Sequence, residues 1–147
     1  MSMAINENLF EAFLKCPTKC YLRSLSKKTT ENVYANWVRT QNESYRNEGI
    51  KRLIEGVTPD KVVVDLPITE NLKTAKWQLA ANFVTRSQNL ESSLHAAERL
   101  SSEEQGKPAQ FIPIRFIFTN SLTSYDKLLL AFNGFVLSEA LGWEVTH

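Results

Sequence analysis

One arginine interrupts an otherwise apolar run of the chain. Residues 111–120 read FIPIRFIFTN, a composition typical of a buried strand, and Arg115 brings a fixed positive charge into it. A guanidinium in a cleft can hold phosphate or carboxylate oxygens through two hydrogen bonds at once. Two interpretations of Arg115 therefore stay open: a phosphate contact, or an ion pair with Glu98 of a neighbouring strand.

A second group of cations repeats every four residues near the N-terminus: Lys15, Lys19, Arg23 and Lys27. This spacing places them on one face of a helix if Pro17 leaves the helical register intact. Such a stripe could contact the phosphates of a nucleic acid. A solvated helix face has the same composition and is the more frequent case. Nucleic-acid binding by this stripe is therefore a hypothesis that depends on a continuous helix.

Few groups are available for catalysis or metal binding. His95 and His147 are the only imidazoles, and Cys16 and Cys20 are the only thiols. His95 has no visible acid or nucleophile beside it, which favours a hydrogen-bonded core or hairpin residue over a catalyst. The segment CPTKC predicts free thiols in a reducing compartment, and two thiols cannot complete a four-ligand metal site.

Length and composition limit the class of protein. The 147 residues, 43% of them hydrophobic, predict a single domain over 1–147, with a helical part at 1–56 and a sheet and helix core at 60–147. A net charge of +1 excludes a globally basic nucleic-acid binder but leaves room for a local basic patch. The N-terminus lacks the pattern of a secretion signal, and no apolar stretch approaches the ~18 residues of a membrane span. We therefore expect a cytoplasmic protein without a membrane partner.

Helical periodicity dominates the first third of the chain. Apolar residues predict a helix over 8–25 that Pro17 breaks or restarts. A longer helix is predicted from a cap at Thr29 or Thr30 to about Glu55. We expect the aromatic stripe of this helix to belong to the core: Tyr34, Trp37 and Tyr45.

After Pro59 the pattern becomes that of strands. Extended segments are predicted at 61–68 (a candidate edge strand), 77–85, 94–100, 111–118 and from 143 onward, with a polar turn at 87–93. A helix with Thr123 as N-cap and Asp126 at its third position ends at Gly142. Its expected apolar face is Leu128, Phe132, Phe135, Val136 and Ala140. This order predicts an α+β fold, a mixed sheet flanked by helices with an N-terminal helical region.

Two stretches resemble one nuclease family. FLKCPTKCYLRSL (13–25) resembles the N-terminal F-x-x-C-P-x-K-x-Y-L signature of RecB-like nucleases, which include the CRISPR-associated exonucleases. QFIPIRFIFTNSLTSYDKLLLAFNGFVLSEALG (110–142) resembles their catalytic strand and the helix after it. These nucleases belong to the PD-(D/E)XK superfamily, so the resemblance implies a restriction-endonuclease-like fold over about residues 9–145. Between the two stretches only the order of elements matches.

The resemblance implies a phosphodiester-hydrolysing site that this chain has lost. Active members hold Mg²⁺ or Mn²⁺ with an aspartate on one strand and a glutamate-x-lysine on the next, followed by a glutamine and a tyrosine on a helix. These positions are occupied here by His95, Arg115, Ile117, Leu128 and Phe132. A fixed cation repels a dication, and no (D/E)-x-K triplet occurs anywhere in the chain. We therefore expect a catalytically inactive nuclease-like protein, a pseudoenzyme.

The resemblance also bears on cofactors. Cluster-bearing members of the family ligate an iron–sulfur centre with a cysteine at the place of Cys16 and three more near the C-terminus, which this chain lacks. We expect no cofactor, and we expect Cys16 to pack as a small apolar residue. The chain ends where a further strand begins, so a fragment or a natural truncation of a longer nuclease-like protein stays open.

Three functional hypotheses follow. The first is an inactive nuclease fold that binds DNA or a protein partner. The second is an active DNA nuclease dependent on Mg²⁺ or Mn²⁺, with acids supplied by Asp65, Glu98 or Asp126. The third is a structural module that forms homo-oligomers or other assemblies. A cluster of carboxylates would favour the second, and a large exposed apolar patch without basic surroundings would favour the third.

Overall fold

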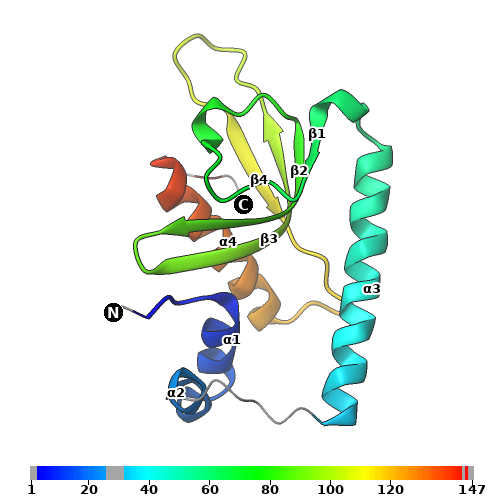
Figure 1. Ribbon diagram of the computed structural model, residues 1–147, viewed down its shortest axis with the longest axis vertical. Coiled ribbons are helices and arrows are strands. Elements are labelled where there is room, and N and C mark those ends of the chain that lie inside the picture. The colour runs from blue at the N-terminus through cyan, green and yellow to red at the C-terminus, as the bar shows by residue number, and fades with distance from the viewer. Residues whose placement is uncertain (1–2, 26–31, 144, 146–147) are drawn as a thin grey trace.

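Three helices precede a four-stranded sheet, and a fourth helix follows it (Figure 1). The computed structural model describes residues 3–25, 32–143 and 145. The elements are α1 (Glu7–Lys15), α2 (Pro17–Leu25), α3 (Val33–Glu55), β1 (Val62–Val64), β2 (Leu79–Ser87), β3 (Leu90–Leu100), β4 (Gln110–Ile114) and α4 (Ser124–Leu141).

The sheet is mixed, as the sequence predicts. Its strand order is β1-β2-β3-β4, with β1 parallel to β2 and the other pairs antiparallel. The short β1 lies at the edge, where the proline-bounded segment was expected. The α+β class, with helices flanking a mixed sheet and a helical N-terminal region, is confirmed.

Several predicted boundaries in the sheet are wrong. β1 covers only Val62–Val64 of the predicted 61–68, and β4 ends at Ile114, so the strand predicted at 111–118 stops before Arg115. β3 begins at Leu90, which pairs with Ser87, so the polar turn is only two residues long. Gln88 adopts the left-handed φ of 53° that such a tight turn needs, and the polar residues after it pair in the ladder. At the C-terminus, Trp143 and Val145 belong to no strand, while the rest of the predicted last strand lies outside the described residues.

The core lies between the sheet and α4. Its large members come from β2, β3, β4 and α4, together with Leu66 after β1 and Trp77 just before β2: Leu66, Trp77, Phe83, Leu94, Phe111, Leu137 and Leu141. The capping box of Thr123 and Asp126 and the left-handed Gly142 at the helix end are both confirmed. The predicted apolar face is only partly right, because Leu128 and Phe135 are exposed.

The aromatic stripe of α3 is exposed, and the prediction that it belongs to the core is wrong. Tyr34, Trp37 and Tyr45 are 72%, 55% and 46% exposed. Among the helix residues only Ile50 is buried. Asn32 caps the helix by accepting from the Ala35 amide at 2.7 Å, while the predicted caps Thr29 and Thr30 lie outside the described residues. Helical spacing identifies a face, but it does not show that a second surface covers that face.

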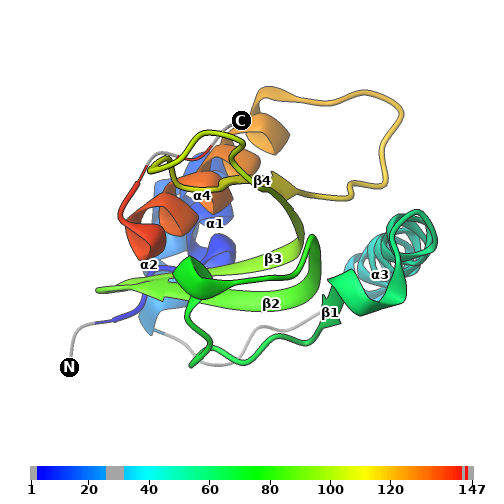
Figure 2. The ribbon, with the colours of Figure 1, turned by 90° about the horizontal axis from the view of Figure 1, so that it is seen from above.

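α3 stands beside the body formed by the sheet, α1 and α4, and the segment after β4 reaches across to it (Figure 2). The Phe116 ring packs directly on Gly49, where any side chain would overlap it. Asn42 Oδ1 accepts from the Phe118 amide at 3.4 Å, and the Phe118 and Tyr45 rings lie 5.9 Å apart. The segment following Arg115 therefore attaches α3 to the body.

Gly49→Ala is expected to destabilise the protein. The new Cβ would overlap the Phe116 ring, and this overpacking outweighs the gain of about 1 kcal/mol in helix propensity. We expect the free energy of unfolding to fall by about 1–2 kcal/mol in urea titrations. Gly56→Ala is the matched control, because its Cβ would meet only ordinary contacts from 3.5 Å outward. Equal stability of the two variants would contradict the Phe116 contact.

Candidate functional site

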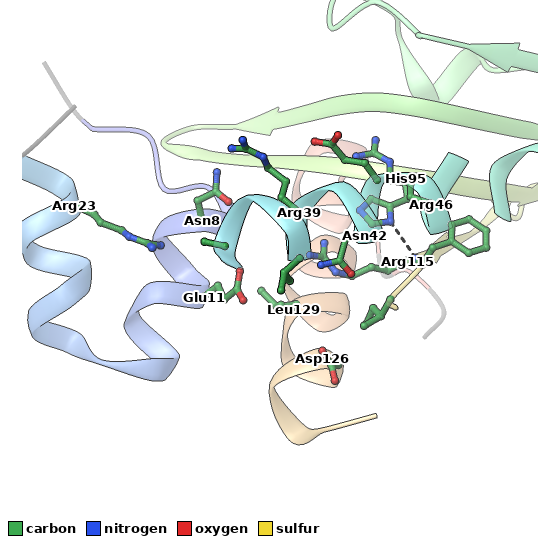
Figure 3. A pocket seen from close by; sticks show the side chains of 15 residues that line it. Asn8, Glu11, Arg23, Arg39, Asn42, Arg46, His95, Arg115, Asp126 and Leu129 are labelled. Atoms are coloured by element: carbon green, nitrogen blue, oxygen red, sulfur yellow. Dashed lines mark hydrogen bonds between the residues drawn. The ribbon is translucent and has the colours of Figure 1, made fainter. Parts of the chain in front are cut away.

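A cleft of about 560 Å³ lies between α3 and the body (Figure 3). Four arginines line it, from α2, from α3 and from the segment after β4: Arg23, Arg39, Arg46 and Arg115. Its acidic residues are Glu11, Glu43 and Asp126. His95 and Ile117 also line the cleft, so three of the positions singled out by the family resemblance meet here.

Arg115 occupies one wall of the cleft, immediately after β4. Its Nη1 donates to Asn133 Oδ1 of α4 at 3.4 Å. Glu98, the alternative partner, pairs with Ile112 further along the ladder. The hydrogen bond of Arg115 therefore goes to α4 rather than to Glu98.

Asn133 connects Arg115 to a buried polar network that the sequence did not reveal. Its Nδ2 donates to Glu7 Oε1 at 2.8 Å and to Ser92 Oγ at 2.7 Å. The same Glu7 oxygen accepts from the Ser93 amide at 2.6 Å. The available signal was a single asparagine on the buried face of an apolar helix, because buried polar groups require hydrogen-bond partners. The network fixes the position of the Asn133 amide, whose oxygen accepts the hydrogen bond from Arg115.

Arg46 approaches the cleft from α3. Its Nη2 donates to Asn82 Oδ1 at 2.6 Å, whereas its Nε is buried and has no hydrogen-bond partner. Burial is the main cause that lowers the pKa of Arg46, and the charge of Arg115 lowers it further. Glu7 and Glu43 act in the opposite direction. Arg46 and Arg115 therefore repel each other across the cleft, and one donor of Arg46 remains unused.

Asn82 holds Arg46 from an unusual backbone conformation. It lies in the middle of β2 with φ at 52°, in the left-handed region that non-glycine residues seldom adopt. Asparagine tolerates this region better than most residues. Such local strain tends to persist where the surrounding structure or a function requires it. Here it places the Asn82 amide oxygen within reach of Arg46.

His95 is a hydrogen-bonded residue of the hairpin, as expected. Its Nδ1 accepts from the Phe116 amide at 3.0 Å, and the two rings are stacked with an interplanar angle of 6°. Burial, followed by the charges of Arg46 and Arg115, lowers the pKa of His95 to about 3. The imidazole is therefore neutral at pH 7, and its proton is on Nε2 because Nδ1 is the acceptor.

The low pKa of His95 makes stability depend on pH. In the unfolded chain the imidazole binds a proton near pH 6.5, whereas in the folded protein it binds one only near pH 3. The stability that neutral His95 contributes to the folded protein is fully present above pH 6.5, and it is lost as the pH falls toward 3. Relative to His95→Gln, the wild type should lose up to about 1.4 kcal/mol per pH unit in that window. Urea titrations at several pH values measure the difference, and parallel curves for the two proteins would contradict it.

The N-terminal cations do not form one continuous stripe. Cys16 is extended, as is usual before proline, so α1 ends at Lys15 and α2 begins at Pro17. Lys15 pairs with Glu11 at 2.6 Å, and Arg23 of α2 lines the cleft. Lys19 lies on α2, and Lys27 lies outside the described residues. Cys16 is exposed, so its expected apolar packing is wrong, and both thiols are free.

The remaining positions singled out from the sequence are scattered. Phe132 is buried and stacks on Phe10 at 4.8 Å, while Leu128 is exposed on α4. Asp126 caps α4, Asp65 follows β1 and Glu98 lies on β3. Across the described ranges, no three His, Cys, Asp or Glu side chains are grouped to hold a metal ion. Among the described residues, Asp65, Glu98 and Asp126 therefore do not form the metal site that the active-nuclease hypothesis requires.

No family model, curated protein or solved structure matches this chain. Within the part of the chain that the structure describes, every helix is too short or too polar to span a bilayer.

Proposed function

We propose that this protein is a catalytically inactive nuclease-like module whose cleft binds the phosphate backbone of nucleic acid. The observation that carries the proposal is the convergence of Arg46 and Arg115 from opposite walls of one cleft. A phosphate oxygen between two guanidinium groups relieves their mutual repulsion and accepts their hydrogen bonds.

The same charges argue against a metal ion in this cleft. A dication would meet two guanidinium groups where the resembling nucleases offer carboxylates. His95 is neutral and offers only the N–H of Nε2, which suits an anion better than a metal. The restriction-endonuclease-like core implied by the resemblance is part of this proposal, with β4 and α4 in the places of the catalytic strand and its helix. The free thiols suit a cytoplasmic protein.

An aromatic pair beside the cleft favours single strands over duplexes. Phe118 and Tyr45 are about half exposed, and Phe118 follows the cleft residues Phe116 and Ile117. Exposed rings next to a cationic groove offer stacking surfaces to unpaired bases, whereas paired bases are already stacked on each other. We therefore expect the protein to bind single-stranded oligonucleotides more tightly than duplexes.

A protein partner is the second candidate function. The exposed apolar residues of α2 and of the first turns of α3 favour it: Tyr21, Leu22, Leu25, Val33, Tyr34 and Trp37. Side chains of this kind are enriched at protein interfaces. Lys19 and Arg23 lie on the same α2, so this surface is not free of basic residues.

Fluorescence anisotropy of end-labelled single- and double-stranded DNA tests the proposed function. The proposal predicts a rise in anisotropy that persists for hours in Mn²⁺ as in EDTA and weakens with salt. A fall below the value of free DNA in Mn²⁺ alone would mean cleavage and would contradict the inactive module. An unchanged anisotropy at low salt with both DNAs would shift the weight to the protein partner.

A further inference from the structure

We propose that α3 is a clamp that closes on the body when an anionic ligand enters the arginine cleft. This inference rests on the proposed function, since it concerns how the same cleft holds its ligand. In this proposal α3 moves relative to the sheet, α1 and α4, and the bound ligand holds the two parts together.

α3 is weakly attached for a helix of its length. It has 23 residues, and only Ile50 among them is buried. Most of the stability of a helix in a protein comes from a buried apolar face, which α3 therefore lacks over most of its length. Its attachments at Arg46 and Gly49 lie in its second half, and the one at Asn42 lies just before its middle. The first half is the part most free to move away from the body.

Each side of the cleft carries two arginines, accompanied by Glu43 on α3 and by Glu11 and Asp126 on the other side. Arg39 and Arg46 come from α3, while Arg23 comes from α2 and Arg115 from the segment after β4 (Figure 3). Without a ligand, repulsion between Arg46 and Arg115 opposes the approach of α3. Arg46 is restrained by its hydrogen bond to the strained Asn82, and its Nε has no partner. Guanidinium groups therefore line the cleft on both sides.

A bound phosphate group would replace this repulsion between Arg46 and Arg115 by attraction of both to the same ligand. Its oxygens can accept hydrogen bonds from Arg46 and Arg115 together only when α3 lies against the body. A ligand that makes more contacts in one conformation shifts the population toward that conformation. Binding should therefore suppress the opening of α3, and the suppression should require a guanidinium on each wall.

Hydrogen exchange measured by mass spectrometry tests the clamp, with a short single-stranded DNA as the probe. Saturating DNA is expected to slow exchange of the amides at 36–50 about tenfold and to leave those at 92–98 of β3 unchanged. Anisotropy in the same buffer reports independently whether the DNA is bound. Bound DNA without added protection of α3 would overturn the clamp and leave the proposed function intact. Failure of the DNA to bind would overturn both.

Two variants separate clamping from general stabilisation. Arg46→Gln removes the charge from the α3 wall, so at saturating DNA the added protection of 36–50 should be lost. Arg52→Gln is the matched control on the same helix, because Arg52 is exposed and pairs only locally with Glu48 at 3.1 Å. It should show the full protection. Equal protection in both variants would overturn the clamp.

Discussion

Asn133→Ala is expected to lower the free energy of unfolding by about 3 kcal/mol, because it breaks a buried network that links α1, β3, α4 and the segment after β4. Asn133 is 2% exposed, and its side-chain amide is hydrogen-bonded to Glu7, Ser92 and Arg115. Alanine would leave the buried Ser92 hydroxyl and the partly buried Glu7 carboxylate with fewer hydrogen-bond partners. Urea unfolding followed by circular dichroism measures the loss.

Asn47→Ala is the control for this prediction. Asn47 is an exposed residue of α3, so both substitutions replace an asparagine by alanine within a helix. The gain in helix propensity is the same in both and cancels in the comparison. We expect the control to change stability by no more than about 0.5 kcal/mol. Similar losses in the two variants would mean that the network contributes little.

The double variant Arg46→Gln/Arg115→Gln is expected to bind single-stranded DNA about 100-fold more weakly than the wild type. Each substitution removes one charge-assisted hydrogen bond to phosphate, while glutamine keeps a polar side chain in the cleft. Arg46 is half-buried and hydrogen-bonded to Asn82, so its truncation is also expected to affect stability. Binding should therefore be compared at a temperature where circular dichroism shows both proteins folded.

The double variant Arg52→Gln/Arg86→Gln is the control for the change in net charge alone. Both arginines are exposed, pair with nearby glutamates and lie outside the cleft. Their replacement together changes the net charge by the same amount as the double cleft variant. Affinity for DNA should change less than about threefold, because solvent screens distant charges. An equal loss in the two double variants would indicate general electrostatic attraction rather than a phosphate site.

Local signals in the sequence predicted much of the fold. The capping box at Thr123 and Asp126 and the helix end at Gly142 are each determined by neighbouring residues. The break at Pro17 follows from the missing amide hydrogen and the restriction on the preceding Cys16. The position of β1 at the sheet edge follows from its short, proline-bounded segment.

Contacts distant in sequence could not be predicted in this way. Glu7 and Asn133 are 126 residues apart, and neither has a local pattern that indicates the other. Arg46 was not singled out because an arginine on a helix is ordinarily solvated. The exposure of Trp37 was missed for a related reason: helical spacing predicts a face, whereas its burial depends on a partner surface. The cleft itself forms only when α3 and the segment after β4 meet.

The salt dependence of DNA binding tests most directly whether the two cleft arginines contact phosphate. The slope of log affinity against log salt reports how many counterions binding displaces. With single-stranded DNA, the double variant Arg46→Gln/Arg115→Gln should have a slope about 1.4 units shallower than the wild type, about 0.7 for each lost phosphate contact. The Arg52→Gln/Arg86→Gln control should keep the slope of the wild type. An unchanged slope in the cleft variant would contradict phosphate binding by Arg46 and Arg115.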